Sequence, residues 1–527
     1  MTPAAGSSVA SLMERPRAGR PPLTGGPERR GRPHPSDPLD GVRPGGRRSY
    51  WLRQALASEG PELASAAAAP PFSGAATADV AIVGGGYTGL WTALRLREVD
   101  PGARIVILER DICGGGPSGR NGGFVTGWWD ELPGLIARFG ETEAVRAARA
   151  MDDAIASLGP WCEAHAVDAE WLPAGFLQVS AAPAQDGAWD DGVEATARVR
   201  AGDRWFAVSP DDVAQHAKSP VFRGGAWMPH AGTVQPGRLA RGLRRVALEA
   251  GIEIHEGTSA ILPDGQARGS NAVQIATTSR RGSGLLTADR VVVATNAWAA
   301  GWSPVGRRLL TWSSYIVLTE PVPDLLEEIG WTAGEGIADA RFTLHYARTT
   351  ADGRIALGGG GGRAGWGGRI GRVFTHDAGS AARAADGLRR WFPSLADVRI
   401  EDAWGGPIDI TDDHRPWFGT LPGGRIHFGL GDSGNGVAAS IMGGRILAAL
   451  AAGSGGPDDD LATLPIVGDG ATPKAFPPEP LRGVGARVFR EATVRREAAQ
   501  EAGRRAPRFT TLVSRVPRRL GYHLGPE

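Results

Sequence analysis

The fold class of this chain follows from one stretch, Ala78-Asp-Val-Ala-Ile-Val-Gly-Gly-Gly-Tyr-Thr-Gly-Leu90. Its apolar first half predicts a buried parallel strand, and residues 91–97 continue as a helix. Between them, Gly84, Gly86 and Gly89 fill the pattern G-x-G-x-x-G. The first glycine allows a tight turn, the second lets the backbone approach a pyrophosphate, and the third lets the helix pack closely on the strand. The stretch therefore predicts the opening unit of a dinucleotide-binding α/β domain.

A second strand that ends in an acid extends this unit. Ile105-Val-Ile-Leu-Glu109 places a carboxylate about 20 residues past the last glycine, the spacing expected of a group that binds the adenosine ribose. An acid there disfavours the 2′-phosphate of NADP. The helix N-terminus would offer N–H groups and partial positive charge to the pyrophosphate. The alternative is a glycine-rich turn in an ordinary α/β domain, but the order of strand, glycines, helix, strand and acid disfavours it.

Composition narrows the class of protein. The chain has 527 residues, enough for two or three domains, and a formal net charge of +1, which indicates no nucleic-acid partner. Cys113 and Cys162 are its two cysteines, so we expect neither a disulfide framework nor a cysteine-based zinc site, and we predict no metal site at all. No apolar run approaches about 18 residues, and no secretory signal is evident, so we expect no membrane span and a cytoplasmic location.

The chain is predicted to leave the nucleotide-binding domain and return to it twice. The expected fold is α/β (α+β), a Rossmann-like domain with an inserted antiparallel β-sheet domain for the substrate. The active site would lie between the two. We expect a disordered extension over 1–48, nucleotide-binding parts over 49–150, 235–302 and 405–455, substrate-domain parts over 151–234 and 303–404, and a helical basic extension over 456–527.

Three further stretches join the opening fingerprint in a recognisable order. They are Ser118-Gly-Arg-Asn-Gly-Gly123, Val291-Val-Val-Ala-Thr-Asn-Ala-Trp298, and the pair Trp404-Gly-Gly-Pro-Ile-Asp409 and Gly431-Asp-Ser-Gly-Asn-Gly-Val437. Together they resemble the superfamily of FAD-dependent oxidoreductases typified by D-amino-acid oxidase, glycine oxidase and sarcosine oxidase. Within it, the chain is most similar to gamma-glutamylputrescine oxidoreductase-like enzymes. The resemblance covers about residues 50–453.

The resemblance implies FAD as the cofactor and a set of residues that hold it. The residues expected at the cofactor are Gly84, Gly86, Thr88, Gly89, Glu109, Arg110, Ser118, Arg120, Asn121, Gly122, Gly123, Ala260, Ala294, Thr295, Asn296, Trp298, Gly431, Ser433, Gly434, Asn435, Gly436 and Val437. Some relatives attach FAD through a cysteine near the last motif. Because no cysteine lies beyond Cys162, we expect non-covalent FAD.

The turn from Gly431 to Val437 carries the most mechanistic expectation. In the family, a helix begins there and points at the pyrimidine edge of the flavin. Backbone N–H groups and the helix dipole would stabilise the negative charge of the reduced flavin, so we expect that form to be anionic.

Substrate residues are expected on the β-sheet domain. On the strand that holds His345, the side chains of Tyr346 and Arg348 share one face, and they are the preferred pair. Arg348 would bind a carboxylate, or alternatively form a surface salt bridge. Asp409 would neutralise an ammonium group, although a structural role is the stronger interpretation. A core role is equally open for three tryptophans that would otherwise wall the site. These are Trp128, Trp129 and Trp404.

The expected reaction is oxidation of a C–N bond in an amine or amino acid, such as a gamma-glutamyl-polyamine-like substrate, by hydride transfer to flavin. Oxygen or another acceptor would take the electrons. Two alternatives stay open from the sequence, an NAD-dependent dehydrogenase and a flavin-binding scaffold without turnover. The basic segment 482–505 is predicted to be a solvated amphipathic helix, because Glu491, Glu497 and Glu501 interrupt its charge. The sequence predicts no oligomeric state.

Overall fold

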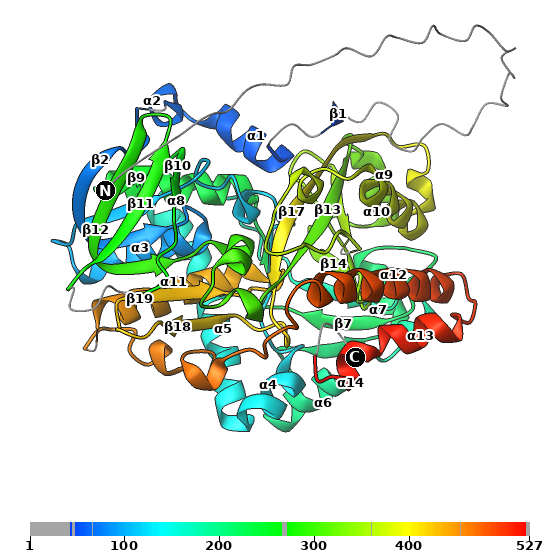
Figure 1. Ribbon diagram of the computed structural model, residues 1–527. Helices are drawn as coiled ribbons and strands as arrows, with labels where there is room; N and C mark the ends of the chain where they lie inside the picture. The colour runs from blue at the N-terminus through cyan, green and yellow to red at the C-terminus, as the bar shows by residue number, and fades with distance from the viewer. Residues whose placement is uncertain are drawn as a thin grey trace, which may run out of the picture.

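The computed structural model describes residues 43–44, 48–65, 67–265, 271–359, 361–453 and 455–522 of the chain. Two large sheets lie side by side in it, the first on the left of Figure 1 and the second on the right. The described part of the predicted N-terminal extension includes a two-residue strand, β1 (Arg43–Pro44), which pairs with the second sheet. The rest of that extension, apart from Arg48, lies outside the described residues.

The first sheet is built on five parallel strands in the order β9, β3, β2, β12 and β19. Its strands are β2 (Gly74–Val83), β3 (Ile105–Leu108), β9 (Glu253–His255), β10 (Thr258–Ala260), β11 (Val273–Ser279), β12 (Gly282–Val293), β18 (Trp417–Thr420) and β19 (Ile426–Leu430). The end of β12 positions the site, because Val293 pairs with Val83 on one side and with Phe428 on the other. The carboxyl ends of three strands that are distant in sequence therefore meet.

Helices cover this sheet and share its largest core. They are α3 (Tyr87–Val99), α4 (Leu132–Phe139), α5 (Glu141–Ala164), α8 (Pro236–Glu249) and α11 (Gly436–Ala452). Helices α3 and α11 approach so closely that a Cβ at Gly444 would lie 2.4 Å from the Cβ of Trp91. The two helices that follow the glycine turns are thus packed against each other.

The second sheet is mostly antiparallel and has the order β1-β17-β13-β16-β15-β14-β5-β7-β6. Its other strands are β5 (Phe176–Val179), β6 (Phe206–Val208), β7 (Gly225–Met228), β13 (Leu310–Thr319), β14 (Gly336–Asp339), β15 (His345–Thr349), β16 (Ile355–Gly359) and β17 (Ile400–Ile410). Helices α6 (Asp190–Arg198), α7 (Pro210–His216), α9 (Pro323–Ile329) and α10 (Ala378–Trp391) accompany it. Ser209 caps α7 in a capping box with Asp212.

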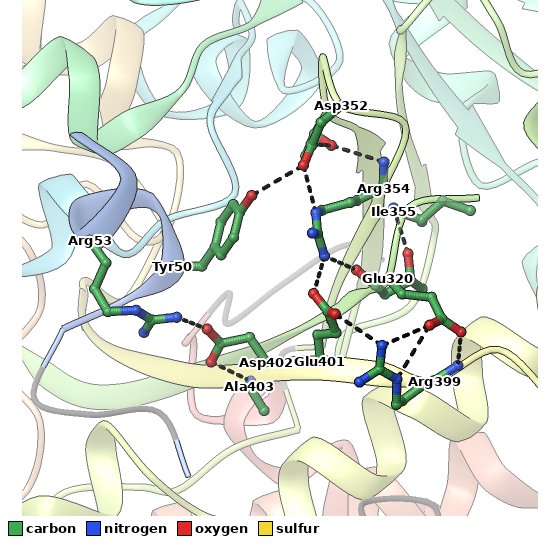
Figure 2. Close-up of polar contacts among 12 residues, drawn as sticks. Tyr50, Arg53, Glu320, Asp352, Arg354, Ile355, Arg399, Glu401, Asp402 and Ala403 are labelled. Carbon is green, nitrogen blue, oxygen red and sulfur yellow. Dashed lines mark hydrogen bonds and ion pairs between the residues drawn. The ribbon is translucent and has the colours of Figure 1, made fainter. Parts of the chain in front are cut away.

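Helix α1 (Tyr50–Ser58) connects the two halves. Its N-cap, Ser49, accepts from the N–H of Leu52 and donates to the carbonyl of Gly119 in the glycine-rich loop. On the other side, Arg53 pairs with Asp402 of β17, and the hydroxyl of Tyr50 donates to Asp352 (Figure 2). Further ion pairs lie next to these contacts of α1. Figure 2 shows them linking Arg354 to Asp352 and Glu401, and Arg399 to Glu320 and Glu401.

The smaller elements are α2 (Pro61–Ala64) and a two-stranded sheet of β4 (Phe124–Val125) and β8 (Gly232–Thr233). The C-terminal segment forms α12 (Leu481–Glu501), α13 (Arg508–Ser514) and α14 (Val516–Arg519), coloured red in Figure 1. The predicted helix is present, but its description as solvated is wrong, because Phe489 and Glu497 are buried against the second sheet domain.

The predicted fold class is confirmed, with a Rossmann-like sheet beside a largely antiparallel one. Strands of the second sheet come from 43–44, 176–228 and 310–410, and strands of the first come from 74–108, 253–293 and 417–430. Among the helices of the described ranges, none has both the length and the apolar character needed to cross a bilayer.

Candidate active site

Both glycine turns open into one cavity of about 1080 Å³. Gly84 and Gly86 line it from the end of β2, while Gly434 and Gly436 line it from the end of β19. The reason is topological, because β12 lies between these strands and its end, at Ala294, lines the same cavity. The two turns therefore converge on one site, as the sequence interpretation requires.

The first turn has the tight packing that its glycines predict. A Cβ at Gly84 would lie 2.3 Å from the carbonyl oxygen of Ala294, and one at Gly89 would lie 2.0 Å from that of Gly84. Gly89 thus packs helix on strand and does not line the cavity. Gly86 caps α3 without a side-chain hydrogen bond, and Thr88 lines the cavity in the first helical turn. The helix N-terminus is open to a bound anion.

Glu109 lies at the cavity and is held by the backbone. Its carboxylate accepts from the N–H of Gly85 at 2.8 Å and from the N–H of Asp111 at 2.7 Å. Burial raises the pKa of Glu109 to about 6, and these two hydrogen bonds oppose the shift. A ribose hydroxyl would add a further donor to this carboxylate.

The loop from Ser118 to Gly123 passes beneath the same cavity. The Ser118 hydroxyl accepts from the N–H of Tyr87 at 2.9 Å, which ties the loop to the start of α3. Arg120 is buried and donates to the carbonyls of Gly115 and Gly405, so it joins the loop to the second sheet. Burial lowers the pKa of Arg120 to about 10, which still leaves it charged at neutral pH.

Within this loop, Ser118, Arg120, Asn121 and Gly122 line the cavity and Gly123 does not. The Asn121 side-chain oxygen accepts from the N–H of Gly123 at 2.7 Å and so fixes the turn. Gly123 has φ of +81°, and a Cβ there would lie 2.1 Å from the carbonyl oxygen of Val234. Gly123 therefore serves the packing of the loop.

Ala260, Thr295 and Trp298 also line the cavity. The guanidinium of Arg110 stacks over the Trp298 ring, 4.6 Å from its centroid. A flat, cationic wall of this kind suits an aromatic base such as adenine. It lies on the Glu109 side, where the dinucleotide pattern predicts the adenosine.

Asp409 holds the second glycine turn from behind. Its buried carboxylate accepts from the N–H of Gly431 at 2.6 Å and from the side-chain amide of Asn296 at 2.8 Å. Asp409 and Gly431 do not line the cavity, whereas Asp432 and Asn296 do. Burial raises the pKa of Asp409 to about 6, and burial beside Asp409 raises the pKa of Asp432 well above its usual value. Asp409 therefore positions the turn, and its predicted contact with an ammonium group is wrong.

The start of α11 faces the cavity directly. The cavity is lined by the first two helix residues, by the N-cap and by the two residues before it, namely Gly436, Val437, Asn435, Ser433 and Gly434. The Asn435 side-chain oxygen accepts from the hydroxyl of Thr126 at 2.9 Å and makes no capping bond to the helix. The first-turn N–H groups of α11 therefore receive no side-chain cap, which leaves them available for the expected charge-stabilising role.

The preferred substrate pair is separated by the structure. Tyr346 lines the cavity, and its hydroxyl lies 2.8 Å from that of Ser314 on β13. Arg348 does not line it. The Arg348 guanidinium donates to the carbonyls of Val234 and Thr349 and lies over the ring of Trp51. The two residues share a strand face, but Arg348 lies further along β15, beneath the Gly123 turn, so its prediction as a carboxylate-binding residue is wrong.

Three tryptophans that were candidates for an aromatic wall belong to the core. Trp128, Trp129 and Trp404 are buried and none lines the cavity. The Trp404 indole N–H donates to the carbonyl of Arg120 at 2.9 Å.

Asp130 was not singled out from the sequence, although it directly follows the two tryptophans. It lines the cavity, and its Oδ1 is buried with no hydrogen-bond partner among the described residues. Burial, and then the charge of Glu131, raise its pKa to about 7. The signal that distinguishes it is one buried carboxylate oxygen without a partner among the described residues, which only tertiary packing reveals.

The residues present fit FAD. Two open helix N-termini suit the pyrophosphate and the flavin, Glu109 suits the ribose, and the glycines remove side chains where a dinucleotide would approach. A dinucleotide site between a Rossmann-like sheet and an antiparallel sheet defines a two-domain dinucleotide-dependent oxidoreductase.

Comparison with known proteins identifies the family. Residues 79–450 match the family of FAD-dependent oxidoreductases that includes D-amino-acid oxidase, and the chain belongs to that family. It is therefore an FAD-dependent oxidoreductase, as the sequence resemblance predicts. This family match favours neither the NAD-dependent dehydrogenase nor the scaffold without turnover.

Two curated proteins are similar to the chain along most of their length. One is the probable oxidoreductase OrdL of Rhizobium meliloti, 31% identical over 405 residues that cover 75% of this chain and 88% of that protein. The other is gamma-glutamylputrescine oxidoreductase of Escherichia coli, 28% identical over 410 residues that cover 74% and 87%.

Two solved structures share the fold. Glycine oxidase from Bacillus cereus aligns with a TM-score of 0.56 and 18% identity, covering 72% of this chain and 98% of that one. L-amino acid deaminase from Proteus vulgaris aligns with a TM-score of 0.56 and 17% identity, covering 80% and 96%.

Proposed function

We propose that this enzyme oxidises the C–N bond of an amine or amino acid and passes the electrons to non-covalently bound FAD. The observation that carries the proposal is the single cavity that joins the two glycine turns to Tyr346 and Asp130. Relatives named for gamma-glutamylputrescine, glycine, L-amino acids and iminodiacetate support the substrate class. Neither Cys113 nor Cys162 lines the cavity, which supports non-covalent attachment.

When bound, FAD would supply the hydride acceptor, and the protein would orient the substrate and move protons. Asp130 is our candidate to take the proton of the substrate ammonium group. Its unpaired Oδ1 lies at the cavity, and a carboxyl group with a pKa of about 7 is matched to that transfer near neutral pH. Tyr346 and Ser314 would orient polar groups of the substrate through their shared hydrogen bond.

The start of α11 would stabilise negative charge on the cofactor. Its N–H groups would stabilise negative charge near the cofactor as it develops, each charge-assisted bond contributing roughly 1.5–3 kcal/mol. Asp409 would act on the cofactor only through Gly431 and Asn296, by keeping that turn in place.

Anaerobic reduction tests the proposal. Purified protein should be yellow, with an absorbance band at about 450 nm. Mixing with amines in the absence of oxygen should bleach that band. The panel should include polyamines, their glutamyl conjugates, aminophosphonates and small amino acids. Readmitting air, or adding a quinone instead, identifies the electron acceptor. A flavin that dithionite bleaches and no amine or amino acid reduces would contradict the proposal.

Asp130→Asn tests the proton acceptor. The wild type should show kcat/KM rising with pH through an inflection near pH 7, since the ionised carboxylate is the active form. The variant should lose that inflection and fall by roughly 100-fold at neutral pH, with FAD content unchanged. Asp153→Asn, on the exposed side of α5, is the matched control. An unchanged inflection in Asp130→Asn would exclude this role.

A further inference from the structure

The C-terminal helix α12 lies beyond the family match, which ends at residue 450, and yet it supports one wall of the cavity. That wall is the segment from Asp339 to Leu344, which connects β14 to β15 and which we call the 339–344 loop. Asp339, Arg341, Phe342 and Leu344 of this loop line the cavity. The contacts that hold this loop in place therefore determine the shape of this wall of the cavity.

Glu497 of α12 holds the backbone of the loop. Its carboxylate accepts from the N–H of Phe342 at 2.9 Å, from the N–H of Thr343 at 3.3 Å, and from the Thr343 hydroxyl. The Glu497 side chain is 4% exposed. Next to it, the rings of Phe342 and Phe489 meet edge to face at 5.0 Å. The loop is thus fixed from outside the cavity by one helix.

Glu501 of the same helix governs the charge of the loop. Arg341 is the cationic side chain of the loop, and all of its nitrogens are engaged. Nε donates to Asp339 at 2.8 Å, Nη1 donates to Glu501 at 2.6 Å, and Nη2 donates to Nδ1 of His345. Burial, and then Arg341 itself, hold the pKa of His345 well below its usual value, so that ring is a neutral acceptor.

The cluster is balanced in charge. Asp339, Glu497 and Glu501 carry three negative charges, and Arg341, Arg390 and Arg496 carry three positive ones. Arg390 lies 3.2 Å from Glu501, and Arg496 lies 3.9 Å from Glu497. Asp339, His345 and Glu501 lie close enough to hold a cation, and the Arg341 guanidinium occupies that position. This pairing engages three of the five N–H donors of Arg341 and offsets its charge, which disfavours bidentate binding of a substrate carboxylate.

We propose that α12 is a selectivity element of this site. Glu501, together with Asp339, neutralises Arg341, so the 339–344 loop does not bind a carboxylate, and Glu497 keeps the loop in that arrangement. Glu501 and Glu497 are positioning residues that act through Arg341 and the loop backbone. The inference rests on the proposed function only in assigning this end of the cavity to the substrate.

Benzoate and its neutral counterpart benzamide are suitable probes of the loop in the full-length holoenzyme. Binding is followed by the change in the visible spectrum of the bound flavin, without turnover. Glu501→Gln keeps the shape and removes the charge, so it should bind benzoate about tenfold more tightly than the wild type, with benzamide affinity unchanged. Glu491→Gln is the matched control, since Glu491 lies on the same helix and pairs with Arg490 and Arg495 at the surface.

Two results would overturn the proposal. One is a folded, yellow Glu501→Gln protein that binds benzoate no more tightly than the wild type. The other is an equal gain for benzamide, which would mean that the substitution opened space and did not uncover a charge. Because neither probe is a substrate, these readouts stand apart from the amine panel, and failure of that panel would contradict the proposed function alone.

Amide hydrogen exchange of the wild-type protein covers the case in which Glu501→Gln fails to fold. In the wild-type holoenzyme, the amides of Phe342 and Thr343 should exchange as slowly as those in the middle of α12. Glu497→Gln should accelerate both and leave FAD content intact. Fast exchange of these two amides in the wild type would show that α12 does not hold the loop, and would overturn the proposal.

Discussion

At the scale of single residues, Glu109 links pH to cofactor binding. Its pKa of about 6 in the free protein means that it is a full acceptor above pH 6 and becomes protonated below it. Ribose hydroxyls need the acceptor, so binding favours the ionised form and should be lost as pH falls through 6. We expect FAD affinity to weaken from pH 7 to pH 5, as measured by flavin fluorescence on adding apoprotein.

Glu109→Gln should remove that pH dependence and weaken FAD binding by roughly 10- to 100-fold, the equivalent of one charge-assisted hydrogen bond. Glu98→Gln, an exposed residue on α3 that pairs with Arg95, is the control. Equal pH dependence in the wild type and in Glu109→Gln would assign the titration to another group.

Tyr346 is the predicted substrate residue that does line the cavity. Burial raises its pKa to about 12, so the phenol stays neutral over the working range and acts as a hydrogen-bonding group. Tyr346→Phe should lower kcat/KM for the best amine roughly 2- to 10-fold, with FAD content and the shape of the pH profile unchanged. Tyr50→Phe, which removes a hydroxyl from a surface contact with Asp352, is the control. A lost inflection in the Tyr346→Phe profile would mean that the phenol transfers a proton.

At the scale of elements, the packing of α3 on β2 depends on one missing side chain. Gly89→Ala would place a Cβ 2.0 Å from the Gly84 carbonyl oxygen, so the helix must move away from the turn. We expect the free energy of unfolding to fall by roughly 1–3 kcal/mol and FAD to bind more weakly. Chemical denaturation measures the first and flavin titration the second. Gly60→Ala, where a Cβ would meet nothing within 4 Å, should change neither. An unaltered Gly89→Ala protein would show that the turn tolerates movement.

At the scale of the whole molecule, cofactor binding and substrate-side architecture come from different parts of the chain. The described contacts of α12 include the 339–344 loop, Arg390 of α10, Gly361 and Gly362, Trp366, and Gly306 and Leu309. None of these lies in a glycine turn. Truncation after Gly485 should therefore keep the ratio of FAD to protein while lowering the melting temperature and kcat/KM. Loss of FAD from a folded truncated protein would contradict this separation.

The sequence by itself determined the first sheet, the two glycine turns and the helices that follow them. These features depend on short-range properties, namely apolar periodicity and glycines where the backbone must turn or approach closely. The helix predicted over 91–97 is observed as α3, and the helix predicted to begin at the 431–437 turn is observed as α11.

Only the tertiary structure decided which polar side chains reach the cavity. Tyr346 and Arg348 share a strand face, and they diverge because the Val234 carbonyl lies where the guanidinium can bond to it. Arg341 lines the cavity, but its charge is neutralised by Asp339 and by Glu501, which is 160 residues away in the sequence. Burial and charge pairing arise between segments that are distant in the chain, so no local pattern in the sequence records them.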